Sequence, residues 1–297
     1  MPNGKLKLMN GIQKRAFLAA FLVGALSLPL LAQDYKSDPR ALIRHAIENE
    51  SKQEAAKHYF MSRDVKKKKN GDVETREMVE TPQVILARLV ALNGQALNED
   101  QKKKEDARLN RLINSPDELA KKKKEQHDDD QRVRRMVAAI PDAFNFEYVG
   151  TEPTPGGEIV TLKFQPNPNW DPPSRELSVY TGMQGVVKVA VPQYRLALMQ
   201  AQLFKDVDFG WGILGHLDKG GDFMIQQGDV YNGHWDLTHM KLHFTGKVLV
   251  FKSLNIQQDE TMSDFRPVPE MNVAQALDRL KQADTEYAKN ANGGSGK

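Results

Sequence analysis

The second half of the chain alternates apolar and polar residues along short segments that are joined by turn signals. The clearest turn is Asn232-Gly233, because both residues tolerate positive φ. This turn predicts that Tyr231 faces His234 and that Val230 faces Trp235. A period of two between tight turns is typical of antiparallel hairpins with one buried face. The pattern therefore excludes an all-helical fold and a parallel βαβ fold.

Earlier hairpins are predicted in the same way. At Asn70-Gly71 the turn places Lys69 opposite Asp72 and Lys67 opposite Glu74, so the basic run 66–69 is interpreted as a solvated hairpin tip. A nucleic-acid contact by this run is the alternative, but no aromatic residues interleave with it. Further strands are predicted at 84–92, 144–148, 160–164, 187–191, 194–198 and 248–256.

Helix signals occur in three places. Asp38-Pro39 predicts a helix to about residue 57, with Asp38 as N-cap. Residues 98–140 carry two capping patterns, and Pro141 is expected to end the second helix. Residues 121–132 include no apolar residue, which predicts a projecting or frayed helix. A last helix is predicted at 273–287, with residues 289–297 as a flexible tail.

Residues 1–32 have the pattern of a signal peptide. A basic start with Lys14 and Arg15 precedes an apolar run from Ala16 to Leu28, and cleavage is expected after Ala32. Met9 is an alternative start, and an uncleaved anchor or a buried helix is the alternative interpretation. The net charge is +3. Because the leader is basic and carries no acidic residue, its removal leaves a nearly neutral chain, which does not favour nucleic-acid binding.

The composition and motifs do not favour catalysis. The chain has no cysteine, which excludes disulfides, thiol chemistry and a lipidated cysteine. The run 210–215 matches G-x-G-x-x-G, but its antiparallel surroundings are not those of a dinucleotide site. His234 lies on the opposite strand face from His239 and His243, so no metal site is expected. His216 and Asp218 share a direction and form the only candidate for an enzyme, so we expect no enzyme activity and no cofactor.

Large apolar side chains gather on strand faces in the second half. A sheet that curls beneath a helix would turn its concave side into an apolar cavity suited to acyl chains. Ordinary core packing is the alternative interpretation. The residues predicted to line such a cavity are Phe146, Tyr148, Phe164, Trp211, Phe223, Trp235 and Phe244.

This order of elements resembles that of the LolA/LolB-like outer-membrane lipoprotein-sorting proteins. The resemblance lies mainly within residues 144–258, in the valine-rich strand 179–189, the turn 193–196 and the hairpin 232–240 with Thr245-Gly246-Lys247. It implies an unclosed half-barrel whose open face is plugged by helices and whose apolar cavity accepts lipid acyl chains. The polar segment at about 98–140 is longer than this pattern needs and is interpreted as an insertion.

These observations together predict an α+β fold in which helices pack on the concave face of a curved antiparallel sheet. Residues 33–288 are expected to form one domain. The predicted function is that of an exported periplasmic protein, not lipidated, that binds a lipid or a lipoprotein acyl group as a carrier or sorting factor. The alternative is an interaction or envelope-stress sensor module that docks an envelope partner through residues 98–132 and holds no lipid.

Overall fold

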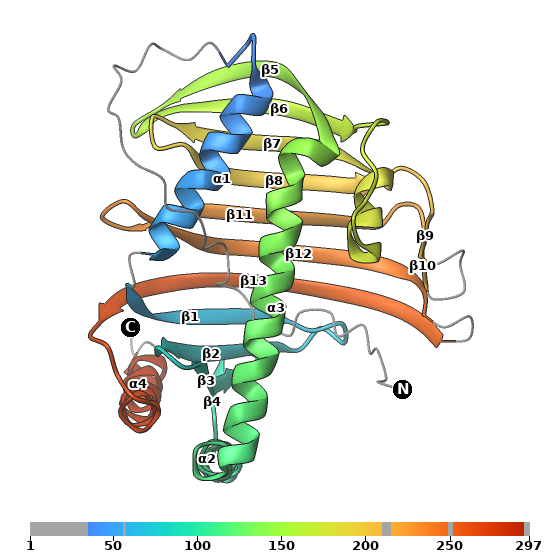
Figure 1. Ribbon diagram of the computed structural model, residues 1–297. Helices are drawn as coiled ribbons and strands as arrows, with labels where there is room; N and C mark the ends of the chain where they lie inside the picture. The colour runs from blue at the N-terminus through green and yellow to red at the C-terminus, as the bar shows by residue number, and fades with distance from the viewer. Residues whose placement is uncertain (1–34, 56–57, 210–214, 249–251, 294–297) are drawn as a thin grey trace.

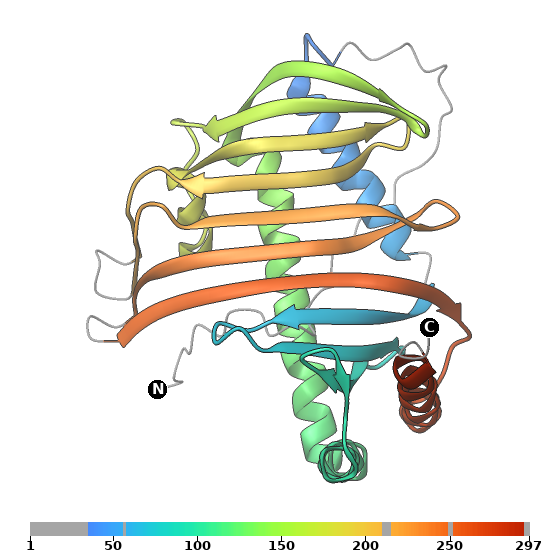
Figure 2. The same cartoon turned by 180° about the vertical axis from the view of Figure 1, so that it is seen from behind.

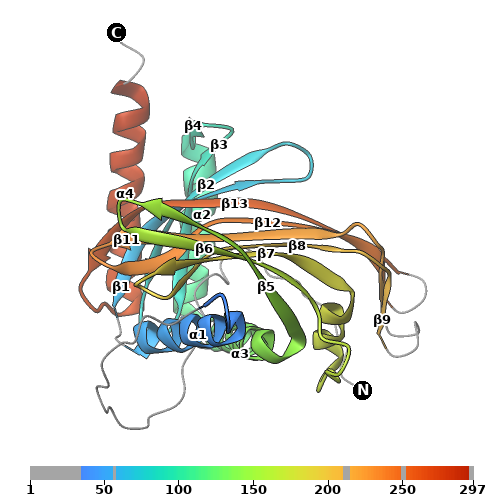
Figure 3. The same cartoon turned by 90° about the horizontal axis from the view of Figure 1, so that it is seen from above.

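A computed structural model describes residues 35–55, 58–209, 215–248 and 252–293. The described chain forms one long, curved antiparallel sheet that does not close on itself. Helices α1 (Pro39–Ala55) and α3 (Pro116–Ala143) lie across its concave side (Figures 1 and 3). Figure 2 shows the sheet from the convex side, with both helices behind it. The predicted fold class, an open curved sheet with helices on its concave face, is confirmed.

The remaining elements follow the chain in hairpins. The other helices are α2 (Glu99–Asn114), the 3-10 helix η1 (Arg175–Gly182) and α4 (Val273–Gly293). The strands are β1 (Tyr59–Lys67), β2 (Val73–Glu80), β3 (Ile85–Leu92), β4 (Gln95–Ala96), β5 (Phe144–Thr154), β6 (Gly157–Pro166), β7 (Met183–Val191), β8 (Arg195–Leu203), β9 (Val207–Phe209), β10 (Gly215–Leu217), β11 (Asp222–Tyr231), β12 (His234–Val248) and β13 (Lys252–Val268).

The strand order in the sheet is β4-β3-β2-β1-β13-β12-β11-β8-β7-β6-β5, and β9 and β10 extend it beside β12. Most neighbours are consecutive hairpins. The exceptions in this order are β1 beside β13, which joins distant parts of the sequence, and β8 beside β11, between which β9 and β10 intervene in the chain. The pairing of β1 with β13 joins the N-terminal hairpins and the C-terminal hairpins into one sheet. No helix within the described ranges has both the length and the apolar character needed to cross a bilayer.

The Asn232-Gly233 turn is confirmed, and its register is half right. Tyr231 faces His234, but Trp235 faces Asp229 because Val230 bulges out of the ladder. The bulge has a local cause, since both carboxylate oxygens of Asp229 accept from the Gly233 N–H at 3.0 Å. An aspartate can thus add one residue to a hairpin whose turn dipeptide alone would not require it.

The Asn70-Gly71 turn is present, but the predicted register is wrong by one residue. Lys67 faces Val73 and Lys66 faces Glu74. The loop is wider because the Lys68 N–H donates to the Asp72 carbonyl at 2.7 Å and the Asn70 side chain holds Asp72. Lys66 pairs with the buried Glu260 at 2.8 Å, so only the rest of the basic run lies at a solvated tip.

The predicted helix starts are confirmed and several ends are not. Asp38 caps α1, Asn98 and Gln101 form a capping box, and Ser115 caps α3. Pro141 lies inside the last turn of α3 instead of ending it, and the helix continues to Ala143. Helix α4 likewise continues to Gly293 through the start of the predicted tail. The strand predicted at 248–256 is instead the last residue of β12 and the start of a longer β13, with residues 249–251 outside the described residues.

Two apolar cores lie on opposite sides of the sheet. The larger core fills the space between the concave face and helices α1 and α3, where Leu42, Ile43 and Ala46 of α1 are fully buried. The smaller core lies where β1, β2 and β3 turn away from the main sheet, and α4 covers it with Ala276 and Leu280. The sequence periodicity predicted these inward-facing helix positions correctly.

Candidate functional site

The concave face is apolar over the half that α1 covers. Its residues come from strands β5 to β8, β11 and β12, because alternate positions on each strand share a face. Phe144, Leu162 and Val189 are fully buried there. The aromatic rings of Phe144 and Phe164 have their centroids 4.7 Å apart, and the Tyr180 ring of η1 lies 5.0 Å from Phe144. This apolar half is the candidate site for a hydrocarbon ligand.

Five of the seven predicted cavity residues lie in or against this core. Phe164, Phe223 and Phe244 are buried within it, and Phe146 and Tyr148 are partly buried against it. Trp235 is half-buried near the end of the β11–β12 hairpin, where its backbone contacts α1. Trp211 lies outside the described residues. That these side chains line a ligand cavity remains a prediction.

Sequence reasoning did not single out Tyr180. Its hydroxyl donates to the Met136 carbonyl of α3 at 2.9 Å, and complete burial raises the pKa of the phenol. Trp170 packs beside it, with ring centroids 6.3 Å apart. The pair closes the end of the apolar half where η1 meets α3. The strand pattern could not reveal it, because both residues lie in irregular segments.

Polar contacts hold the C-terminal half of α1 to the sheet. The Gln53 amide donates to the Trp235 carbonyl at 2.6 Å and accepts from the Trp235 N–H at 2.9 Å. Arg195 of β8 donates to the Asn49 carbonyl at 3.1 Å and also contacts the Gln53 side-chain oxygen. Glu50 pairs with Arg195 at 3.2 Å. This group, Asn49, Glu50, Gln53, Arg195 and the Trp235 backbone, is called the α1 anchor below.

Glu50 is the carboxyl group of the α1 anchor, and its pKa is shifted by its surroundings. Burial raises its pKa to about 7, although Arg195 and the Leu196 N–H both favour the ionised form. The carboxylate of Asp236 on β12 raises it further. The anchor therefore contains a group that changes charge near neutral pH.

The other half of the concave face is charged. The inward positions of β13, β1 and β2 carry ionisable residues in place of apolar ones, and Asp64 and Glu260 are almost completely buried. Lys66 pairs with Glu260 at 2.8 Å, and Arg76 pairs with Glu74 at 2.5 Å. Lys66 lies on this face because it is two residues from Asp64 on the same strand.

The all-polar stretch of α3 lies over this charged half and does not project. It is held by polar contacts with the free edge of β3. The Gln126 amide accepts from the Ile85 N–H at 3.0 Å and donates to the Ile85 carbonyl at 3.2 Å. On α2, Glu105 accepts from the Leu89 N–H at 2.9 Å and Arg108 donates to the Ala87 carbonyl at 2.8 Å. Three successive edge positions are thereby satisfied by helix side chains.

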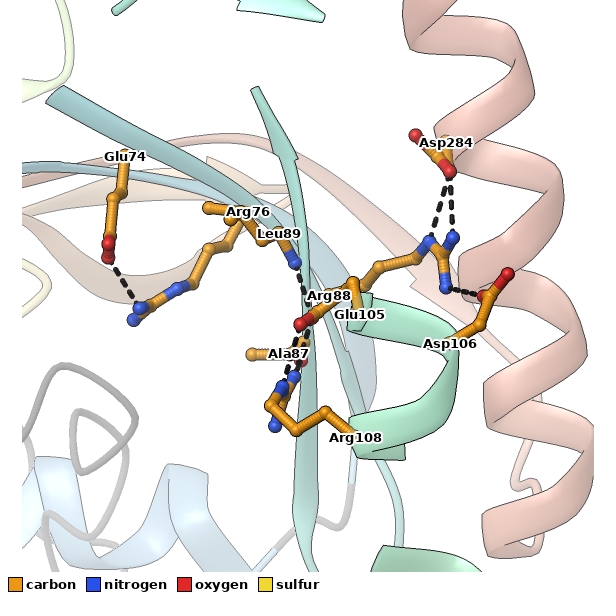
Figure 4. Close-up of polar contacts among 9 residues, drawn as sticks. All are labelled: Glu74, Arg76, Ala87, Arg88, Leu89, Glu105, Asp106, Arg108 and Asp284. Atoms are coloured by element: carbon orange, nitrogen blue, oxygen red, sulfur yellow. Dashed lines mark hydrogen bonds and ion pairs between the residues drawn. The ribbon is translucent and has the colours of Figure 1, made fainter. Parts of the chain in front are cut away.

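Arg88 joins the same region to α4 (Figure 4). Its guanidinium donates to Asp284 of α4 at 2.8 Å and to Asp106 of α2 at 2.6 Å. Only 3% of the Arg88 side chain is exposed, and 8% of Asp284. Figure 4 shows this guanidinium on the opposite side of β3 from those of Arg76 and Arg108. The strand therefore carries one arginine network on each face.

His234, His239 and His243 each have a different acidic partner, and His234 lies 3.9 Å from Asp236. His239 contacts Asp259 at 2.9 Å, and His243 contacts Asp222 at 3.4 Å. His216 is hydrogen-bonded to Asp208 at 2.7 Å, which raises its pKa, and its other ring nitrogen lies 3.3 Å from Asp218. Within the described ranges, no three His or acidic side chains are placed to hold a metal ion.

The G-x-G-x-x-G match falls mostly on residues 210–214, outside the described residues. Its last glycine, Gly215, opens the strand β10, which pairs with β9 and β12. A dinucleotide fingerprint requires a helix at this point. The context therefore disagrees with the motif, as the sequence predicted.

No protein-family model matches this chain, and no curated protein matches it. Two similar solved structures are found. One is described as an outer membrane lipoprotein-sorting protein domain from Vibrio parahaemolyticus, with 10% identity and a TM-score of 0.31, covering 82% of this chain and 97% of that chain. The other is a DUF1329 family protein from Desulfovibrio piger, with 12% identity and a TM-score of 0.27, covering 81% of this chain and 98% of that chain. Both TM-scores are below 0.5, so neither structure supports a function for this chain.

Proposed function

We propose that this protein binds an acyl chain of a lipid or of a lipoprotein against the apolar half of the concave face, in a carrier or sorting role. The observation that carries the proposal is the open curved sheet whose apolar concave half is covered by a separate helix, α1. A helix that covers a sheet is an element whose displacement exposes a continuous apolar surface. Such a surface binds hydrocarbon by removing it from water.

The apolar part of the binding free energy follows from the length of acyl chain that is buried. Each buried methylene contributes about 0.8 kcal/mol, so an eight-carbon stretch contributes about 6 kcal/mol before ordering costs. The ligand would compete with α1 for the apolar half of the concave face. Part of this free energy would therefore be spent on separating Leu42, Ile43 and Ala46 from the sheet, which favours reversible binding.

The proposed compartment is the periplasm. The signal-peptide pattern of residues 1–32 supports export, and the absence of cysteine from the sequence removes the residue to which a lipoprotein anchor is attached. An acyl carrier between two membranes must keep its cargo away from water, which is what a covered apolar face provides.

Native mass spectrometry of the mature protein, purified from its own cell envelope, tests the proposal. We expect bound lipid masses that disappear when Phe146 and Tyr148 are both replaced by alanine, because both side chains border the apolar half. Val149→Ala is the matched control, since Val149 lies on the same strand and is 50% exposed. If the spectrum shows only the mass of the protein itself, and no added lipid is taken up, the proposal is wrong and the protein-binding role is favoured instead.

A further inference from the structure

The convex face of the sheet carries an open groove of about 730 Å³ that crosses strands β5 to β8 and the start of β11. Figure 2 shows these strands from the convex side, with α1 and α3 behind them. The groove has the size of a small-molecule site, for which volumes of about 300–1,000 Å³ are usual. Its side chains are mainly polar, because the alternate residues Phe164, Ala201 and Phe223 are buried in the core on the other face. This hollow is called the outer groove below.

Four glutamines line the outer groove from three adjacent strands, and they are Gln165 on β6, Gln184 on β7, and Gln200 and Gln202 on β8. Gln184 pairs with Gln202 in the ladder, and Gln165 and Gln184 come directly after the pair Phe164 and Gly185. The glutamines therefore form a row across the strands, at the interstrand spacing of about 4.8 Å. All four are exposed, and within the described ranges none of their side-chain amides makes a hydrogen bond to the protein. Their donors and acceptors are available to a ligand.

The charged side chains of the outer groove lie toward its two ends. On the β5 side, Glu147 and Lys163 face each other in the ladder. On the β11 side, Asp222 lies 3.4 Å from His243. The centre carries the glutamines and the half-buried Val186, whose neighbours in the ladder are Lys163 and Gln200. The centre of the outer groove is therefore uncharged, with one apolar side chain among the amides.

This chemistry limits the class of ligand that the outer groove can bind. Each glutamine amide has two N–H donors and a carbonyl acceptor, a combination that pairs with hydroxyl groups. A hydrocarbon chain would leave these amides without partners. An extended peptide is recognised mainly at the edge of a sheet, whereas β6, β7 and β8 are inner strands whose backbone groups pair with their neighbours. A ligand with many hydroxyl groups and no net charge fits the outer groove.

We propose that the outer groove binds a neutral oligosaccharide. Hydroxyl groups of successive sugar rings pair with the row of glutamine amides, and the C–H face of one ring packs on Val186. The four strands from β6 to β11 span about 15 Å, so the site accommodates several rings. The outer groove lies on the opposite face of the sheet from the apolar half, so this inference does not rest on the proposed function.

NMR of the 15N-labelled mature protein tests the proposal. The protein is titrated separately with chitotetraose, cellotetraose and maltotetraose, three neutral tetrasaccharides. We expect saturable shifts with at least one of them, and these shifts include the side-chain NH2 signals of Gln184 and Gln202 but not that of Gln226. Gln226 is the matched control, because it is an exposed glutamine of β11 on the same face and outside the outer groove. Absence of saturable shifts with all three sugars, or shifts that spare Gln184 and Gln202, would overturn the proposal.

Variants test whether the amides carry the binding. The double variant Gln184→Ala with Gln202→Ala removes two amides at exposed positions, so folding should be preserved, and circular dichroism checks this. We expect the Kd for the tightest of the three sugars to increase at least tenfold in the double variant and to stay within twofold of wild type in Gln226→Ala. Equal affinities of wild type and double variant would show that the sugar binds elsewhere, and the proposal would be wrong.

A charged sugar tests the uncharged centre of the outer groove. Tetraglucosamine carries an ammonium group on each ring and is titrated in the same way. Because the centre offers no charge to these ammonium groups, we expect tetraglucosamine to bind no more tightly than the tightest neutral sugar. Binding at least tenfold tighter than that of every neutral sugar would show recognition by the carboxylates of Glu147 and Asp222, which contradicts the proposed class of ligand.

Discussion

Two glutamines on two different helices perform the same structural task. Gln53 of α1 bridges the N–H and carbonyl of Trp235, and Gln126 of α3 bridges those of Ile85. A side-chain amide has one donor group and one acceptor, so it replaces a neighbouring strand residue at each position. Each glutamine thereby fixes a helix at a defined point of the sheet.

Removal of one such amide should be costly. Gln126→Ala leaves the N–H and carbonyl of Ile85 without protein partners at a part-buried site, so we expect a loss of about 1–3 kcal/mol in the free energy of unfolding. Urea denaturation followed by circular dichroism measures it. His127→Ala, at the exposed next position, should change stability by less than about 0.5 kcal/mol. Equal effects of the two substitutions would contradict the bridging role.

Glu50 predicts a pH dependence of stability. Its pKa is raised from 4.5 to about 7 by folding, so the folded state binds the proton more tightly than the unfolded state. The stabilising contribution is complete below about pH 4.5 and is lost as the pH rises through 7, with a total of about 3 kcal/mol.

Urea unfolding at pH 5, 6, 7 and 8 checks this dependence. Glu50→Gln cannot ionise, so its unfolding free energy should decline less over this range than that of the wild type. Glu48→Gln is the control, because the Glu48 side chain is 62% exposed. If wild type and Glu50→Gln have parallel pH profiles, the carboxyl group is not the source of the dependence.

At the scale of elements, the polar helices α2 and α3 complete the sheet. Strand β4 is only two residues long, so most of the edge of β3 would otherwise face solvent. Glu105, Arg108 and Gln126 occupy that edge with side chains. These segments of α2 and α3 have few apolar residues because their side chains bond to backbone groups and to charged side chains.

Arg88 of β3 joins three elements, because its guanidinium pairs with Asp106 of α2 and with Asp284 of α4. Arg88→Met would leave Asp284 buried without its cation, and we expect a loss of about 3–5 kcal/mol in unfolding free energy. In the double variant Arg88→Met with Asp284→Leu, both charges are gone, so most of the loss should be recovered. Thermal and urea unfolding of both variants measure this. A double variant no more stable than the single one would show that the arginine acts through packing instead.

At the scale of the whole molecule, the concave face has two halves of different chemistry. The apolar half lies beneath α1 and the charged half beneath the first part of α3. The two halves meet along β12 and β13, where Met240 and Phe244 face Glu260 and Ile256 across the ladder. The division follows from the joining of the N-terminal hairpins to the C-terminal ones at β1 and β13.

This arrangement predicts an ordered pattern of hydrogen exchange. Strands β12 and β13 have neighbours on both sides, so their amides should exchange only with global unfolding. Strand β5 has only β6 beside it and includes an exposed Val149, so its amides should exchange sooner. Mass spectrometry of peptides from deuterated protein measures both. Equal protection of β5 and β13 would contradict the open-sheet architecture.

The sequence by itself determined the features that depend on residues close together in the chain. The Asp38 and Ser115 caps, the positive-φ turn at Asn232-Gly233 and the apolar faces of α1 and α4 were predicted correctly, because each depends on residues within a few positions. Even here a single nearby side chain altered the outcome, since Asp229 and Asn70 each shifted a register by one residue. Local rules therefore gave the elements and the fold class.

Only the tertiary structure decided which charges are buried and what they serve. Arg88 finds Asp284 across 196 residues, and Gln126 finds Ile85 on a strand edge that exists only after β2, β3 and β4 have paired. The polar stretch of α3 was predicted to project because no apolar residue lies within it. Its partners are backbone groups and charges brought together by distant strands, and sequence periodicity measures apolar burial alone.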